Sequence, residues 1–313
     1  MNSIFSGWRL FLSTLKILNR YPVFLVPIMA VWVLYAAITL YLKYFFPWDL
    51  FAPAAATGIM FLAFFVFSLS IVLSCCVVLE LVQQIETGRP PSLAAAAGET
   101  LGRDLAKALP LALLWAVIWF ALSVIEALLS GKKRDGGKDD FNTQNAAGTL
   151  LNQGDFSWTG LSFNLIKKGV RMLVFLILPA IAWEDAGFFA AMKKGISVLR
   201  SHFGKFAAGY ALTGAAATIV FLPPGIILTL GTGRHGSPPT IEFPAYVWTY
   251  VIIYIGLAWS FCMYIEQMFV ASLYLWHMKW EKRAREAARQ GQLPPRFEDI
   301  PQPVLLDNIP DML

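Results

Sequence analysis

The sequence predicts an all-α protein, a polytopic transmembrane helical bundle of about six spans. The chain is 57% hydrophobic and only 14% charged, whereas a soluble domain carries about a quarter charged residues. Long runs contain no charge at all, and three times a short basic amphipathic stretch leads into such a run. We therefore predict three repeats, each made of one interfacial amphipathic helix followed by two spans.

The charge-free runs predict the spans. Each approaches or exceeds the roughly 18–20 apolar residues needed to cross a hydrocarbon core of about 30 Å. The fourth is the weakest because Lys167, Lys168 and Arg171 interrupt it. The first is too long for the apolar part of a cleavable signal peptide, so we expect a retained span. The predicted spans are Tyr21–Leu42, Leu50–Leu79, Ala108–Ile125, Leu161–Trp183, Phe206–Thr232 and Phe243–Ile265.

The amphipathic stretches Ile4–Arg20, Leu93–Lys107 and Phe188–Lys205 open the three repeats. They can be aligned on Leu18, Leu101 and Leu199. In the third stretch the large apolar residues recur every three or four positions, which predicts one helical stripe. An apolar stripe beside cations favours a helix lying in the membrane interface, and packing onto the bundle as an ordinary core helix is the alternative. The stripe consists of Phe189, Met192, Ile196, Leu199 and Phe203.

The second span of each repeat ends in an acidic residue. Ser74–Glu80 and Ser260–Glu266 both fit the pattern S-x-C-x-x-x-E, and Glu184 follows Trp183 at the matching place of the middle repeat. The transmembrane domain therefore covers residues 1–290, with repeats at about 1–87, 88–185 and 186–290. We expect residues 291–313 to form a flexible cytoplasmic tail, with a docking peptide as the alternative.

The distribution of cations predicts the orientation. Most of the 25 Lys and Arg residues fall in the N-terminal stretch, the second and fourth loops and the C-terminal region. This places both termini in the cytoplasm and the protein in the cytoplasmic (inner) membrane. The expected partners are anionic lipid headgroups, with a protein partner or a second copy of the chain as a further expectation. Nucleic acid is not expected, because no basic patch is interleaved with base-stacking residues on a soluble domain.

Ionisable residues inside spans are candidate functional residues. At about 1.5 Å per residue, Lys167 lies about 24 Å and Arg171 about 18 Å above Trp183, and Glu126 lies at nearly the height of Lys167. One hypothesis is a polar pathway for an ion, a proton or an anionic solute. The alternative is that these side chains extend to the headgroups. The candidates are Arg171, Glu126, Lys167, Lys168, Glu80, Glu184 and Glu266.

Pro223 and Pro224 interrupt the fifth predicted span. Two prolines disrupt a helix unless a neighbour satisfies the carbonyls that they free. We expect a kink or an early helix end there, although a broken helix can also mark a transporter site.

No catalytic, cofactor or metal site is predicted. The three cysteines, Cys75, Cys76 and Cys262, all lie in apolar runs and are expected to be packing residues. None of the three histidines has a ligand spacing, and His202, beside basic residues, is expected to be an interface side chain. The protein is therefore predicted not to be an enzyme.

Two parts of the chain resemble a family of uncharacterised prokaryotic six-span integral membrane proteins. They are Leu178–Gly187 with Ala190–Arg200, where an acidic span end leads into a basic helix, and Gly7–Phe11 through Asn19–Pro22. The chain is also similar to the membrane domain of some glycerophosphodiester phosphodiesterases, whose soluble catalytic domain has no counterpart here. The resemblance covers roughly residues 1–285 and implies a six-span fold without an assigned activity.

These observations predict a non-enzymatic membrane protein with a structural, regulatory or lipid-interacting role. A transporter or channel for an ion or anionic solute is the alternative.

Overall fold

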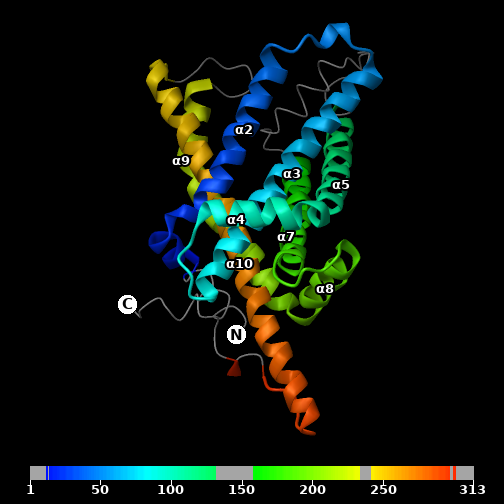
Figure 1. Ribbon diagram of the computed structural model, residues 1–313. Coiled ribbons are helices and arrows are strands. Elements are labelled where there is room, and N and C mark those ends of the chain that lie inside the picture. The colour runs from blue at the N-terminus through cyan, green and yellow to red at the C-terminus, as the bar shows by residue number, and fades with distance from the viewer. Residues whose placement is uncertain (1–11, 13, 132–157, 233–240, 297–298, 301–313) are drawn as a thin grey trace. The chain divides into compact units, whose positions relative to one another are not determined.

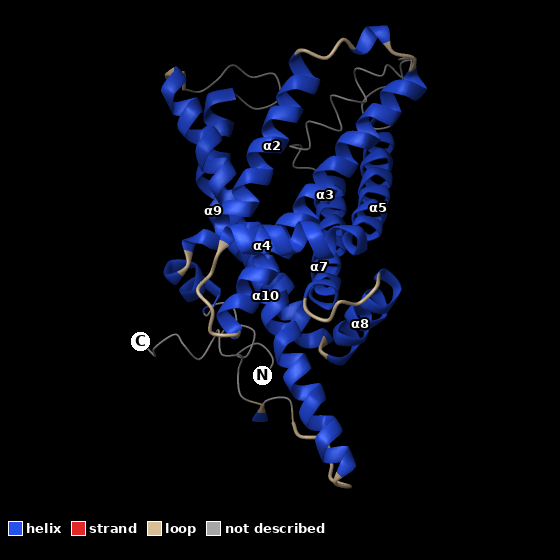
Figure 2. Ribbon diagram, viewed as in Figure 1, coloured by secondary structure: helices blue, strands red, loops and turns tan. Residues whose placement is uncertain are grey.

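The computed structural model describes residues 12, 14–131, 158–232, 241–296 and 299–300. Within these residues all regular secondary structure is helical (Figure 2). The helices are α2 (Leu25–Tyr44), α3 (Pro53–Glu86), α4 (Leu93–Glu99), α5 (Leu105–Gly131), α7 (Trp158–Ala182), α8 (Phe188–Ser201), α9 (Phe203–Thr232) and α10 (Ala245–Arg289), labelled in part in Figure 1. The 3₁₀ helices Pro22–Phe24 and Trp48–Leu50 and a π-helical turn, Thr100–Asp104, complete the regular structure of the described residues. Residues 131–160, whose polar sequence leads us to expect a flexible loop, fall mostly outside them.

Five helical segments are long and apolar enough to cross a membrane, which indicates a multi-pass membrane protein. The fourth predicted span, α7, is helical but is not one of them, because three cations, Lys167, Lys168 and Arg171, interrupt its apolar sequence. The five segments are Pro22–Tyr44, Pro53–Glu86, Leu93–Glu126, Phe203–Gly231 and Ala245–Arg289.

The apolar surfaces of α2 and α9 are exposed along much of their lengths. Val33 is 60% and Ile219 is 71% exposed, and neighbours on the same helices are similarly open. A soluble monomer rarely leaves such continuous apolar surface in water. In a bilayer these faces contact lipid chains, so exposure here agrees with the composition of the spans.

Three helices each contain a continuous run of buried residues. In α3 the buried run covers residues 74–82, in α7 it covers residues 174–182, and in α10 it covers residues 263–274. The other half of α10 differs sharply, since Tyr250 is 69% exposed there. In α3 and α7 the buried run lies near the C-terminal end of the helix, whereas in α10 it lies in the middle, and most of the residues at 282–289 beyond it are exposed.

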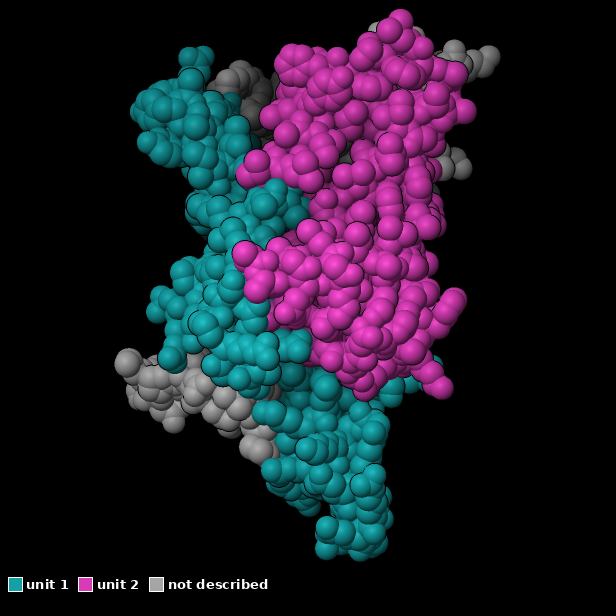
Figure 3. All heavy atoms as spheres, in the orientation of Figure 1, with its two compact units in different colours: residues 1–32, 81–93, 196–313 teal, residues 33–80, 94–195 magenta. Residues whose placement is uncertain are grey.

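The chain divides into two compact units, coloured separately in Figure 3. Compact unit 1 contains Met1–Trp32, Leu81–Leu93 and Ile196–Leu313, and compact unit 2 contains Val33–Glu80 and Ala94–Gly195. In compact unit 1, α9 packs along α10, and in compact unit 2, α5 packs against α7.

The contact between α9 and α10 depends on a glycine. The ring of Phe269, which is completely buried, lies so close to Gly209 that a Cβ there would come within 1.9 Å of it. Only glycine allows this approach, so the position fixes the packing register of the two helices.

The Pro-Pro sequence does not end its helix, so the expected early helix end is wrong. Helix α9 continues through Pro223 and Pro224 to Thr232. Pro224 has no N–H to donate to the carbonyl four residues earlier, that of Val220. The Tyr254 hydroxyl of α10 donates to this carbonyl at 3.0 Å. A neighbouring helix therefore satisfies the group that proline leaves open.

The second amphipathic stretch joins its span without a loop. Helix α4, the π turn Thr100–Asp104 and α5 follow one another directly. Figure 1 shows α4 running across the direction of α5, and π turns are a recognised cause of sharp helix bends. The turn joins α4 to α5 with little loss of backbone hydrogen bonds.

Candidate functional site at the ends of α3 and α7

A cluster of acids and bases lies where α3 and α7 reach their buried ends in compact unit 2. Its centre is Arg103, at the end of the π turn. One terminal guanidinium nitrogen of Arg103 donates both to the Glu80 carboxylate of α3 and, at 2.7 Å, to the Ala182 carbonyl of α7. Its Nε donates to Asp104 Oδ1 at 3.0 Å. One arginine thus connects the ends of two helices to the turn that leads into a third.

Burial makes the arginine necessary. The Glu80 side chain is 1% exposed and that of Asp104 is 0% exposed, while Arg103 itself is 39% exposed. Two carboxylates without water are very unfavourable unless a cation and hydrogen bonds compensate them. The cluster is therefore an ion-pair network that joins these helices. Its arginine is partly exposed, and its two acids are buried.

The chain leaves α7 through a tight reversal. Asp185 has a positive φ of 54°, a backbone conformation that Asp tolerates better than most residues. The Ala186 amide donates back to the Ala180 carbonyl at 3.1 Å, and the Trp183 indole donates to the Leu79 carbonyl of α3 at 3.0 Å. These bonds position the two acids of the reversal, Glu184 and Asp185.

Both acids of the reversal meet a cation. Lys107 donates to Asp185 and Lys194 donates to Glu184. The hydrogen bond and the charge of Lys107 lower the pKa of Asp185 below its usual value. The reversal is thus linked to α5 on one side and to α8 on the other.

Two of the predicted acidic candidates, Glu80 and Glu184, lie in this cluster. The Glu80 side chain is buried and is held by Arg103. Glu266 lies on α10 in compact unit 1, and it is also buried, at 1% exposure.

The predicted charges inside the membrane also form a pair. Lys167 Nζ of α7 lies 2.6 Å from Glu126 Oε2 of α5, and their side chains are 7% and 19% exposed. Their equal height agrees with the estimate from sequence. Arg171 is half-buried and lies one helical turn from Lys167 on the same face of α7, and Lys168 is half-buried as well.

The apolar stripe of α8 is turned away from the packed face of that helix. The buried face consists of small or medium residues, among them Ala191, Gly195 and Val198. Gly195 packs tightly against Ile177 of α7, since an added Cβ would lie 3.3 Å from the Ile177 Cα. By contrast, Phe189 at the start of the stripe is 79% exposed.

Sequence reasoning missed a buried histidine pair in compact unit 1. His202 Nε2 lies 2.9 Å from His277 Nδ1, and the two residues are 75 positions apart. Burial, with smaller effects of His277 and Lys205, lowers the pKa of His202 to about 4. His202 is therefore not the interface side chain that we expected. The one signal in the sequence that could have identified His202 is its position at the turn between the third amphipathic stretch and the fifth predicted span.

Two tryptophans near this pair hold part of the C-terminal region. The Trp276 indole donates to the Ile300 carbonyl at 3.2 Å, and the Trp280 indole donates to the Pro295 carbonyl at 3.0 Å. Ile300 is 3% exposed. Residues 295 and 300 are thus held in place, whereas the flexible tail remains a prediction for residues 301–313, which lie outside the described part of the chain.

Among the described residues, no group of three or more His, Cys, Asp or Glu side chains is arranged to hold a metal ion. The described arrangement is one of charge pairing and helix joining. No protein-family model, no curated protein and no solved structure matches this chain, so the function is argued from these residues alone.

Proposed function

We propose that the chain is a non-enzymatic, lipid-interacting integral membrane protein of the cytoplasmic membrane. It has six spans in three repeats, and both termini are cytoplasmic. The observation that carries this proposal is the apolar stripe of α8, which is exposed at its two ends and half-buried between them. It lies beside exposed cations on a helix that begins just beyond a span end.

The faces of α8 are arranged as an interfacial helix requires. Viewed down the axis, Lys193 and Arg200 lie beyond the stripe on the side away from the buried face, and both are exposed. Phe189 and Phe203 at the two ends of the stripe are 79% and 64% exposed. A helix that packed onto the bundle as a core element would bury these rings. The alternative of ordinary core packing therefore loses support for this helix.

The expected energies favour lipid contact. Burying one large apolar side chain stabilises a state by about 1.5–3 kcal/mol. Each cation near an anionic membrane surface contributes about 1 kcal/mol. Phe189, Lys193 and Arg200 on α8, together with Phe203 at the start of α9, thus supply enough free energy to hold α8 at the headgroup boundary and to favour anionic lipids there.

The turn from amphipathic helix to span supports the three repeats. It falls three residues after the aligned leucine in each case, at Tyr21, at Asp104 and at His202. The residue before the aligned leucine is buried each time, with Ile17 and Thr100 at 1% exposure and Val198 at 0%. Alignment on sequence therefore brings equivalent structural positions together.

The burial of the following span has the same register in the second and third repeats. Buried residues recur at equivalent positions, as the pairs Asp104 and His202, Ala108 and Phe206, Leu111 and Gly209, and Trp115 and Thr213. The acids follow a common rule as well, because Glu80 and Glu184 each pair with a cation of the next amphipathic helix.

The ion pair of Lys167 and Glu126 supports α7, the fourth predicted span, as a further span beside the five apolar segments. A neutralised pair costs far less in a membrane than a single buried cation. Helix α7 begins about 13 residues, or about 20 Å, before Arg171. The long side chains of Lys168 and Arg171 can extend along the helix toward that end. An even number of spans also agrees with the cationic residues near both termini.

The proposal is tested with the full chain in lipid nanodiscs that contain a neutral phosphatidylcholine and an anionic phosphatidylglycerol. Native mass spectrometry measures which lipid is retained. We expect Lys193→Ala combined with Arg200→Ala to lower the preference for the anionic lipid by up to about thirtyfold, since two favourable charges are lost. The control is Lys282→Ala combined with Arg289→Ala, on the exposed end of α10. An unchanged preference in the first variant would contradict the proposal.

The alternative of a transporter or channel is favoured by one observation, the cations Lys167 and Arg171 on one face of a helix inside compact unit 2. Proteoliposomes that contain a pH-sensitive dye and an anion-sensitive dye test it. A flux that the full chain supports and that Arg171→Leu abolishes, with insertion unchanged, would replace our proposal by this one.

A further inference from the structure

We infer that compact unit 2 contains a binding site for a membrane lipid, in which the indole N–H of Trp119 donates to an ester carbonyl at the head of an acyl chain. The site lies between α2, α3 and α5. It does not involve α8, and it depends on the proposed function only in requiring that the chain lies in lipid.

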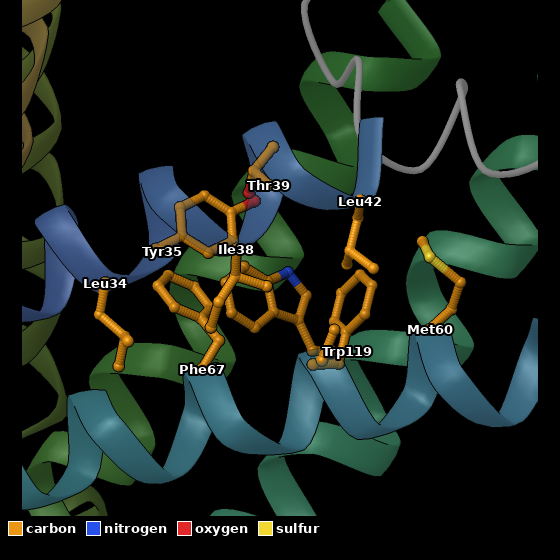
Figure 4. A pocket seen from close by; sticks show the side chains of 10 residues that line it. Leu34, Tyr35, Ile38, Thr39, Leu42, Met60, Phe67 and Trp119 are labelled. Atoms are coloured by element: carbon orange, nitrogen blue, oxygen red, sulfur yellow. The ribbon is translucent and has the colours of Figure 1, made fainter. Parts of the chain in front are cut away.

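The site is a small, largely apolar cavity of about 40 Å³. Figure 4 shows its side chains, contributed by the outer part of α2, by α3 and by Trp119 of α5. The lining residues are Leu34, Tyr35, Ile38, Thr39, Leu42, Met60, Ala63, Phe64, Phe67 and Trp119.

Trp119 is held rigidly in the wall of this cavity. Its ring stacks on Trp115 at a centroid distance of 5.6 Å and an interplanar angle of 9°. Phe64 meets it edge-on at 5.8 Å, and Phe67 lies at 5.3 Å. Because these contacts surround the indole, it cannot easily rotate to find another hydrogen-bond partner.

The indole nitrogen has an unmet requirement. Trp119 Nε1 is buried and has no hydrogen-bond partner among the described residues. A buried tryptophan N–H usually finds an acceptor, and a buried donor left without one is unfavourable. In Figure 4 the nitrogen lies on the side of the ring that faces α2. An acceptor oxygen within the cavity would remove this cost.

Water is a poor occupant of the cavity. A buried water needs two to four polar partners, and the lining offers few, since the hydroxyls of Tyr35 and Thr39 are already hydrogen-bonded to each other. The remaining lining side chains are apolar, including four aliphatic ones and two phenylalanines. An occupant with one acceptor and an apolar body fits this lining better.

The position of the cavity selects a lipid ester. Thr39 is five residues from the end of α2 at Tyr44, or about 8 Å below that end, which is the depth at which an acyl chain begins beneath its headgroup. The side chains of Leu34 and Tyr35 are 44% and 38% exposed, so the cavity borders on lipid-facing surface. Toward the end of α2 it is closed by a cluster around Trp48, whose indole donates to the Leu42 carbonyl at 2.7 Å.

The experiment compares ester-linked phosphatidylcholine with its ether-linked analogue, which lacks the carbonyl. The full chain, labelled with ¹⁵N in its tryptophan indoles, is placed in nanodiscs of each lipid. The Trp119 signal is identified by its loss in Trp119→Phe. We expect its N–H proton to shift downfield in the ester lipid relative to the ether lipid. An identical signal in both lipids would overturn the proposal and would indicate water or an empty cavity.

Two matched substitutions add a second measurement, the amount of ester lipid that stays bound after detergent extraction. Ala63→Leu fills the cavity and should remove one retained lipid per chain, whereas Ala37→Leu, on an exposed face of α2 away from the lining, should not. Trp119→Phe keeps the ring but removes the donor, and should lower retention about two- to tenfold. Equal retention in all variants would contradict the site. Loss of the α8 lipid preference alone would leave it standing.

Discussion

The contacts of Arg103 explain how the buried ends of α3 and α7 are held together in compact unit 2. It compensates two buried carboxylates and also caps a helix carbonyl. Its planar guanidinium presents several donors in a fixed geometry, which lysine cannot do.

Replacing Arg103 should therefore be costly. We expect Arg103→Ala to lower the free energy of unfolding by about 3 kcal/mol, because two buried acids lose their cation. Arg103→Lys should recover only part of this loss, and Glu80→Gln combined with Asp104→Asn should restore much of it in the alanine variant. Unfolding by a denaturing detergent, followed by circular dichroism, measures these differences.

The control is Arg285→Ala, which removes a pair on the exposed face of α10, where the Arg285 side chain is 70% exposed. Such a pair contributes about 0–1 kcal/mol. If Arg103→Ala and Arg285→Ala lower the free energy of unfolding equally, the ion-pair network around Arg103 has no special role in stability.

At the scale of the helices, the pair His202 and His277 connects the start of α9 to the charged half of α10. The rings of both histidines also lie against Trp280, at centroid distances of 5.9 and 5.6 Å. Lys205 lies over the ring of Trp276 at 5.1 Å. The groups that face His202 are thus a second histidine and a cation, and both oppose its protonation.

Stability should consequently fall in acid. Above pH of about 6.5, His202 is neutral in both the folded and the unfolded chain. Below that pH the unfolded chain takes up the proton first, because the pKa of His202 in the fold is about 4. We expect the free energy of unfolding to fall by up to about 1.4 kcal/mol per pH unit between these values. Thermal unfolding at pH 7 and pH 5 measures it, and His202→Gln should flatten the dependence.

The helices were largely predictable from sequence, and their contacts were not. Hydropathy reports how a segment partitions between water and lipid, so it identified the apolar core of α2 and α9. It carries no information about neighbours far along the chain. The bond from Arg103 to Ala182 joins residues 79 positions apart, and the histidine pair spans 75. The continuous path of α9 past its prolines depends on Tyr254, a residue of another helix.

For the whole molecule, the number of spans decides the topology. Six spans place both termini on one side, whereas five place them on opposite sides. The predicted α7 span decides between these outcomes, because its cations weaken its own signal.

We expect N-terminal and C-terminal epitope tags to be protected together in sealed right-side-out cells and to be cleaved together in inverted vesicles. Protease accessibility of each tag measures this. A tag at residue 145 serves as the control and should show the opposite pattern. Opposite behaviour of the two terminal tags would show that α7 does not cross.

Helix α10 is much longer than the hydrocarbon core of a membrane is thick. At about 1.5 Å per residue its 45 residues extend about 68 Å, more than twice a hydrocarbon core of about 30 Å. No proline interrupts this helix, so one continuous helix is long enough to cross the hydrocarbon core and to carry the charged residues near Arg285 well beyond it.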